Sequence, residues 1–260
     1  MGLLDGKKIL VTGIANKYSI AYGIAQSLYK QNATLAFTYH TEKTRKKVLN
    51  IANEMGVKLV IPCDVTNDNS IKKLFFCIKK KWNKFDGFVH SIAHSSKKQL
   101  SGDYINNITR TDFSRVLDVS CYSFSGMAKE CRNILKTNAS LLTLSYIGSQ
   151  RVIPNYNVMG IAKAALESNV KYMAYYMGPN GIRVNAISPS PLKTLSIYGI
   201  KNFKKLLNFT TMCSPNKNPI TIQDVGNVAA FLSSDLSKGI TGQIIYVDGG
   251  LHITAMNNFK

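Results

Sequence analysis

Short apolar runs alternate with amphipathic stretches along this chain, and the alternation constrains the fold more than any other feature. The strands predicted from these runs span residues 8–12, 34–39, 59–63, 87–91, 141–145, 183–187 and 244–247. The helices predicted between them span residues 20–31, 42–55, 70–81, 111–133, 157–177 and 222–232. This order is typical of an α/β fold with a doubly wound parallel sheet of about seven strands and helices on both faces.

Length and composition favour one domain over residues 1–260. The chain has 260 residues, of which 45% are hydrophobic and 18% are charged. It contains no low-complexity run and no Pro/Gly-rich linker that would divide it. Since α/β folds of this size commonly form a single core, we expect a single domain.

The cysteines and the N-terminal segment indicate a cytoplasmic protein. The N-terminal residues lack the basic and apolar regions of a signal peptide, and no apolar stretch reaches the length of a membrane span. Five cysteines without a C-x-x-C motif indicate neither a disulfide framework nor a zinc site, so we expect no metal.

The net charge of +19 is open to three interpretations. The lysine run at residues 79–84 superficially suggests nucleic-acid binding. A helix over residues 70–81, however, would place its lysines largely outside an apolar face, as in an ordinary solvated helix. A lysine-rich composition without functional meaning and an acidic macromolecular partner are the other two interpretations.

In a doubly wound sheet, ligands bind beyond the carboxyl ends of the strands, so the loops there are the candidate site. The loop after the first strand contains Gly13, Ser19 and Ala21 in a spacing that departs from G-x-G-x-x-G. Gly13 can begin the turn, and Ser19 can cap the next helix, whose N-terminus suits a diphosphate.

The ends of the next three strands are compatible with the rest of a dinucleotide. Asp64 follows the third strand and could accept a hydrogen bond from an adenine amino group, although a turn or cap role is an equal alternative. Small residues around Ser91 end the fourth strand. His40 ends the second strand, where an acidic residue would favour NAD and an arginine NADP, so the choice of cofactor stays open on this ground.

Tyr156 and Lys163 lie on one face if a helix runs through residues 157–177. At ~100° per residue the two positions are ~700° apart, which leaves ~20° between them. A phenol that donates to a developing oxyanion, beside an ammonium, is an arrangement suited to a reductase. With 13 tyrosines in the chain, chance could also produce this spacing.

Four segments carry a family resemblance. They are LLTLSY at residues 141–146, YNVMGIAK at 156–163, RVNAISP at 183–189 and VDGG at 247–250. Together they resemble the short-chain dehydrogenase/reductase superfamily, whose fold is of the Rossmann type, over nearly the whole chain.

The register of the tyrosine selects a branch of this superfamily. In the classical branch a serine ends the fifth strand and the helix carries Tyr-x3-Lys, but here Tyr146 and Met159 occupy those positions. The tyrosine stands one turn earlier, at Tyr156. This Tyr-x6-Lys spacing, together with the loop after the first strand, resembles the bacterial enoyl-acyl carrier protein reductases of type II fatty acid synthesis over residues 2–257.

The resemblance implies NADH-dependent reduction of the trans-2 double bond of an enoyl thioester. Tyr156 would donate to the enolate oxygen, and Lys163 would hold the nicotinamide ribose. Three roles are open to Tyr146: assisting Tyr156, contacting the acyl chain or shaping the pocket. The substrate-binding residues implied are Ala93, Tyr146, Tyr156 and Met159. The cofactor-binding residues implied are Gly13, Ser19, Ile20, His40, Asp64, Val65, Ser91, Ile92, Ala93, Lys163, Leu192, Lys193, Thr194 and Leu195.

Two positions depart from the family pattern. His40 stands where the most similar member has Gln, and NADH remains the expected cofactor. Ala93 stands where the family commonly has Gly, and we expect its methyl group to narrow the space beside the nicotinamide and weaken flat stacking inhibitors.

The resemblance also implies a lid, an acidic partner and an assembly. Residues 190–219 would form a loop-and-helix lid over the acyl chain. Lys201, Lys204 and Lys205 could steer the acidic acyl carrier protein toward it, although a solvated helix face is an equal alternative. A homotetramer is expected. The rival functions are another short-chain reductase, such as a ketoacyl reductase, and a basic nucleic-acid-binding protein.

Overall fold

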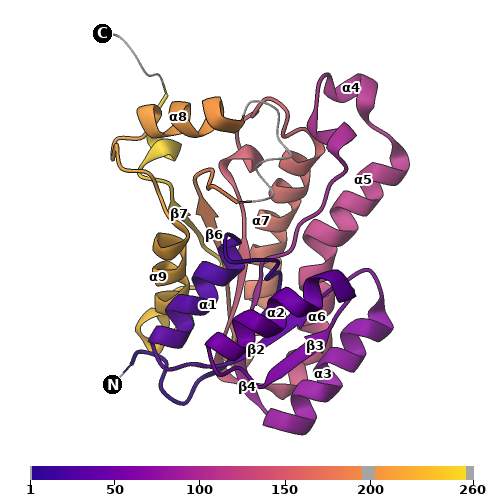
Figure 1. The fold of residues 1–260 in the computed structure, drawn as a ribbon, viewed down its shortest axis with the longest axis vertical. Helices are drawn as coiled ribbons and strands as arrows, with labels where there is room; N and C mark the ends of the chain where they lie inside the picture. Colours follow the sequence, from indigo (N-terminus) through magenta and orange to yellow (C-terminus); the bar gives the residue numbers. More distant parts are fainter. Residues whose placement is uncertain (1, 195–202, 256–260) are drawn as a thin grey trace.

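A parallel sheet of seven strands forms the centre of the computed structural model, which describes residues 2–194 and 203–255 (Figure 1). The strands are β1 (Lys8–Val11), β2 (Thr34–Tyr39), β3 (Leu59–Pro62), β4 (Phe85–His90), β5 (Leu135–Leu144), β6 (Arg183–Pro189) and β7 (Ile244–Val247). They lie in the order β3-β2-β1-β4-β5-β6-β7, and each neighbouring pair is parallel. The expected doubly wound sheet is confirmed.

Helices cover both faces of the sheet. They are α1 (Ile20–Lys30), α2 (Glu42–Glu54), α3 (Asp68–Trp82), α4 (Tyr104–Asn107), α5 (Arg110–Leu117), α6 (Ser123–Cys131), α7 (Val158–Met177), α8 (Phe203–Cys213) and α9 (Ile222–Ser233). Alternate side chains of β1 enter different cores: Leu10 packs with α3, α6 and α7, whereas Ile9 and Val11 pack with α1, α2 and α9. Within the described residues, no helix is long and apolar enough to cross a membrane.

Two glycines bring α1 and α9 into close contact. A Cβ atom on Gly23 would lie 2.5 Å from the carbonyl oxygen of Ile222, and one on Gly226 would lie 2.5 Å from the carbonyl oxygen of Gly23. No larger residue fits at either position without moving backbone. The N-terminal and C-terminal parts of the chain therefore meet through bare backbone on one face of the sheet.

The helical region expected over residues 111–133 is confirmed, because α5, a π-helical turn (Asp118–Tyr122), α6 and a final turn (Arg132–Ile134) follow one another without a break. In the π-helical turn the Ser123 N–H donates to the Asp118 carbonyl. One predicted strand boundary is wrong. The strand expected to begin at Leu141 begins at Leu135, although the positive φ of Asn138 (66°) disturbs it and its register against β4 shifts there. A backbone irregularity of this kind leaves little trace in hydrophobic periodicity.

Candidate active site

The chain order of the strands reverses between β1 and β4, and the carboxyl ends of these strands form one cradle. Gly13 follows β1 with φ of 84°. A Cβ atom there would collide with the carbonyl oxygen of Ser91, which follows β4. Only glycine therefore lets this turn cross the end of β4, which is where dinucleotides bind in doubly wound folds.

Ser19 caps helix α1, as predicted. Its Oγ accepts from the Tyr22 N–H (3.4 Å) and donates to the Asn16 carbonyl (2.7 Å). Ile20, the first residue of α1, lines a cavity at the same edge of the sheet. The free N–H groups of this helical turn and the adjacent glycine turn suit the two phosphates of a dinucleotide.

His40 and Asp64 face each other where β2 and β3 end, with 3.7 Å between Nε2 and Oδ2. Asp64 Oδ1 accepts from both the N–H (2.9 Å) and the Oγ1 (2.7 Å) of Thr66, so this carboxylate does serve as a turn residue. Burial opposes its ionisation, but the Thr66 hydrogen bonds and His40 outweigh burial and lower its pKa. Val65, beside it, is buried in the core.

A cavity of about 380 Å³ opens at the carboxyl edge of the sheet. Seven of the predicted site residues line it: Ile20, Ala93, Tyr146, Tyr156, Met159, Leu192 and Thr194. Lys193 lines an adjacent cavity of about 370 Å³, which shares Ser190 and Pro191 with the first. The prediction for Leu195 lies outside the described residues. The lining residues that the sequence interpretation missed are His94, Ser95, Lys97, Leu100, Ile153, Pro154 and Pro189, whereas Ser190, Pro191 and Leu206 belong to the lid expected over residues 190–219.

Tyr146 and Tyr156 meet edge to face in this cavity, with ring centroids 4.9 Å apart and planes at 72°. Burial raises the pKa of both phenols, so each is a neutral hydrogen-bond donor at physiological pH. The hydroxyl of Tyr146 is buried and has no hydrogen-bond partner within residues 2–194 and 203–255. It can therefore donate to a group that enters the cavity.

The helix expected to carry Tyr156 begins two residues after it, so the predicted shared helical face with Lys163 is wrong. Helix α7 begins at Val158, and Asn155 (φ of 66°) and Asn157 (φ of 44°) flank Tyr156 with positive φ angles. The ring instead packs on Gly148, where a Cβ atom would lie 2.5 Å from its Cδ1. A turn and a glycine surface, not a helical repeat, position Tyr156.

Lys163 is buried on α7, with 6% of its surface exposed, and its Nζ donates to the Leu144 carbonyl at the end of β5 (2.7 Å). Burial lowers its pKa to about 8, although the neighbouring Cys121 and Glu167 oppose this shift. His90 stays neutral because burial and Lys163 lower its pKa to about 3. A protonated Lys163 therefore provides a concentrated positive potential beneath the site below about pH 8.

Glu167 is a buried acidic residue that the sequence interpretation missed. It lies one helical turn after Lys163, and its Oε1 accepts from the hydroxyls of Ser145 (2.5 Å) and Ser149 (2.7 Å). The signal was present in the sequence, since an acid four residues after a candidate lysine lies on the same helical face. Within the described chain, no group of three or more His, Cys, Asp or Glu residues could hold a metal ion.

Known proteins are similar to this chain in both sequence and fold. The family described as enoyl-(acyl carrier protein) reductase matches residues 13–252. The enoyl-[acyl-carrier-protein] reductase [NADH] of Buchnera aphidicola subsp. Baizongia pistaciae is 72% identical over 99% of both chains. The crystal structure of the Aquifex aeolicus enoyl-[acyl-carrier-protein] reductase (NADH) is 46% identical, with a TM-score of 0.95 over 98% of this chain and 100% of that chain.

A relative solved with its cofactor has the same fold. The enoyl-(acyl-carrier-protein) reductase of Anaplasma phagocytophilum in complex with NAD is 41% identical, with a TM-score of 0.95 over 99% of this chain and 98% of that chain. The range matched by the family, residues 13–252, includes the glycine turn and both tyrosines described above. This chain belongs to the enoyl-(acyl carrier protein) reductase family.

Proposed function

We propose that this chain is an NADH-dependent enoyl-acyl carrier protein reductase, which reduces the trans-2 double bond of enoyl thioesters in fatty acid elongation. The observation that carries the proposal is the pair of neutral phenols, Tyr146 and Tyr156, in one cavity at the carboxyl edge of the sheet. Family membership over the full length supports the same reaction.

The cradle at the ends of β1 and β4 fits NADH. Its close glycine turn, the capped α1 helix and the Asp64 carboxylate suit the diphosphate and the adenosine. We propose that Gly13, Ser19, Ile20, His40, Asp64, Val65, Ser91, Ile92, Ala93, Lys163, Leu192, Lys193, Thr194 and Leu195 hold the cofactor. When bound, NADH supplies the hydride that reduces the β-carbon of the thioester.

Tyr156 donates its hydroxyl hydrogen bond to the thioester oxygen, where negative charge collects as the β-carbon is reduced. Its raised pKa keeps the proton on the phenol, so Tyr156 would stabilise the oxyanion as a hydrogen-bond donor, and a proton added at the α-carbon completes the reduction. Tyr146 lies against it and offers a second free hydroxyl to the same cavity. Ala93 and Met159, which line the cavity, complete the substrate surface.

Lys163 holds the ribose of the nicotinamide end and keeps the potential of the site positive. Its ammonium is already oriented by the Leu144 carbonyl, which leaves two of its three N–H groups for other acceptors. In the free enzyme this ammonium loses its proton as the pH rises through about 8. We therefore expect NADH affinity to fall above this pH and to be retained below it.

An acidic carrier would approach over the lid. We propose that residues 190–219 form this lid and that Lys201, Lys204 and Lys205 steer the acyl carrier protein to it. Lys204 and Lys205 are exposed on α8, and Leu206 beside them lines the cavity, whereas Lys201 lies outside the described residues. We also propose that the enzyme is a cytoplasmic homotetramer, with the exposed aromatic residues Tyr172 and Tyr175 of α7 as one contact surface.

The reaction is tested by following NADH absorbance with a crotonyl thioester, beside an acetoacetyl thioester. We expect oxidation of NADH with the crotonyl substrate alone, and reversed selectivity would indicate a ketoacyl reductase. Lys163→Ala should lose NADH binding in a fluorescence titration. Unchanged NADH affinity in that variant would contradict the role given to Lys163.

The steering role is tested by reversing the charges of Lys201, Lys204 and Lys205 to Glu. The variant should be slower with a carrier-bound enoyl substrate, because attraction of the acidic carrier is replaced by repulsion. Its rate with the crotonyl-coenzyme A thioester is the internal control and should be almost unchanged. Equal losses with both substrates would contradict steering and indicate a damaged lid.

A further inference from the structure

Glu167 ties both ends of the loop that carries Tyr146 to one atom. Only 8% of its surface is exposed, and it lies between the buried residues Leu166 and Val170 on α7. Its Oε1 accepts from Ser145 Oγ at 2.5 Å and from Ser149 Oγ at 2.7 Å. Two donated hydrogen bonds compensate the burial of a carboxylate that would otherwise be costly.

The loop held in this way is in contact with both tyrosines. Ser145 directly precedes Tyr146, and Ser149 directly follows Gly148, on which the Tyr156 ring packs. One turn earlier on α7, Lys163 binds the Leu144 carbonyl at the same strand end. Helix α7 therefore binds the end of β5 at two points, through the ammonium of Lys163 and through the carboxylate of Glu167.

We propose that Glu167 is a positioning residue of the active site: it clamps residues 145–149 and thereby sets Tyr146 and Tyr156 in the cavity. The proposal rests on the proposed reductase function. Glu167 itself touches neither substrate nor cofactor in this scheme. It acts through the serine hydroxyls and through its field.

The electrostatic part follows from the groups around the helix. Burial lowers the pKa of Lys163, and Cys121 of the π-helical turn and, to a smaller extent, Glu167 raise it. Burial and Lys163 lower the pKa of His90 on β4, and burial and Glu167 raise the pKa of Tyr246 on β7. Removing the Glu167 charge should therefore allow Lys163 to lose its proton at a lower pH.

Two substitutions separate the clamp from the charge. Glu167→Gln keeps an acceptor oxygen for both serines but removes the charge, whereas Glu167→Ala removes both. Glu130→Gln is the matched control, because Glu130 on α6 makes no hydrogen bond or ion pair through its side chain with the described residues. We would measure thermal unfolding, NADH affinity, and kcat and KM for a crotonyl thioester from about pH 6 to about pH 9.5.

We expect Glu167→Gln to keep a kcat near that of the parent at low pH and to move the alkaline limb of kcat/KM below its parent position near pH 8. Glu167→Ala should lose kcat by about 10²-fold, as a displaced catalytic group does, with a smaller change in KM. Glu130→Gln should match the parent at every pH.

An unmoved alkaline limb in Glu167→Gln would overturn the electrostatic part, and a kcat of Glu167→Ala within about twofold of the parent would overturn the clamp. If Glu167→Ala does not fold, the double variant Ser145→Ala/Ser149→Ala, which removes both donors and keeps the carboxylate, decides the clamp: an ~10²-fold loss of kcat supports it, and a kcat within about twofold of the parent overturns it. Failure of the reductase function itself would be distinct, since the parent would not oxidise NADH with the crotonyl thioester.

Discussion

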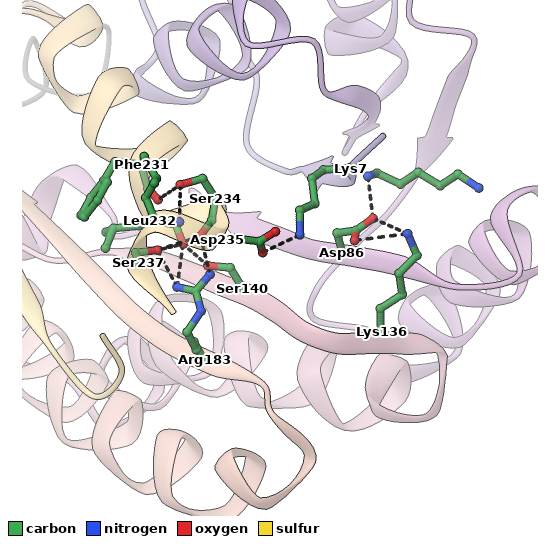
Figure 2. Close-up of polar contacts among 12 residues, drawn as sticks. Lys7, Asp86, Lys136, Ser140, Arg183, Phe231, Leu232, Ser234, Asp235 and Ser237 are labelled. Atoms are coloured by element: carbon green, nitrogen blue, oxygen red, sulfur yellow. Dashed lines mark hydrogen bonds and ion pairs between the residues drawn. The ribbon is translucent and has the colours of Figure 1, made fainter. Parts of the chain in front are cut away.

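Both ends of strands β4, β5 and β6 carry polar side chains. Most of those at the amino ends are hydrogen-bonded, whereas several at the carboxyl ends have no partner among the described residues. At the amino ends, the buried Asp86 of β4 accepts from the Lys8 N–H (2.8 Å) and from Lys136 Nζ (3.0 Å). Arg183 of β6 donates to the Leu232 carbonyl (2.8 Å), the Ser237 hydroxyl (2.8 Å) and the Ser234 carbonyl (3.1 Å) at the end of α9 (Figure 2). These side chains join elements that are distant in sequence.

At the carboxyl ends, polar atoms are left available. Buried side-chain atoms without a partner among the described residues include the hydroxyls of Ser96, Tyr146 and Ser188, all near or beyond the carboxyl ends. At the amino ends, the Nε of Arg183 is the one buried side-chain atom of the described residues without a partner. The two terminal nitrogens of the same guanidinium are hydrogen-bonded. Because unpaired buried groups reduce stability, their concentration at one edge indicates that binding has been favoured there over stability.

The comparison separates two kinds of mutational effect. A change at an unpaired group of the carboxyl edge should alter the reaction and leave the free energy of unfolding nearly intact, whereas a change at the bonded Glu167 should affect both. A change at the amino edge should alter the free energy of unfolding and leave the kinetic constants of the folded protein intact. Each substitution below can break or sharpen this division.

Tyr156→Phe should have the largest effect on the reaction. It removes the hydroxyl that donates to the developing oxyanion, and the loss of one such donor lowers kcat by ~10²–10³-fold, or ~2.7–4 kcal/mol. NADH affinity and the thermal midpoint should stay close to those of the parent. A large fall in the midpoint would show that the carboxyl edge also carries stability.

Arg183→Met should have the largest effect at the amino edge. Methionine keeps much of the apolar volume but leaves carbonyls at the end of α9 with fewer donors, at a cost of ~1–3 kcal/mol in the free energy of unfolding. Denaturant unfolding measures this loss. Parent-like kcat and KM in the folded variant would support the division, and a changed kcat at constant stability would break it.

Asp86→Asn should have the smallest effect of the three. The amide keeps one acceptor for the Lys8 N–H, and the lost partner, Lys136, is 40% exposed, so the ion pair is weakened by solvent. We expect a loss of ~0.5–1.5 kcal/mol in the free energy of unfolding, with no change in NADH affinity. A free energy of unfolding equal to that of the parent would show that Asp86 does not stabilise the fold.

The strand and helix order could be predicted from the sequence because the strands of a parallel sheet are largely apolar runs, such as those of β1 and β3. The glycine turn and the Ser19 cap could be predicted as well, since both depend on local chemistry. The prediction of one helical face shared by Tyr156 and Lys163 is wrong. The positive φ of Asn157 (44°) keeps helix α7 from extending back to Tyr156, and nothing in the hydrophobic pattern reports it.

Other parts of the site depend on contacts between distant segments. The hydrogen bonds of Glu167 with Ser145 and Ser149 form only when the end of β5 lies beside α7. Leu206 lines the cavity only when α8 packs over the carboxyl edge of the sheet. Neither arrangement can be predicted from residue spacing along the chain. The family resemblance supplied residue types for the site, but it did not supply the loop clamp.

The glycine contact between α1 and α9 also has a consequence for biosynthesis. Gly23 leaves the ribosome about two hundred residues before its partner Gly226, so the α9-facing side of α1 stays uncovered while most of the chain is made. Contacts so far apart in sequence slow folding and prolong exposure of apolar surface. Nascent chains that end before α9 should therefore be the form of this protein most dependent on chaperones.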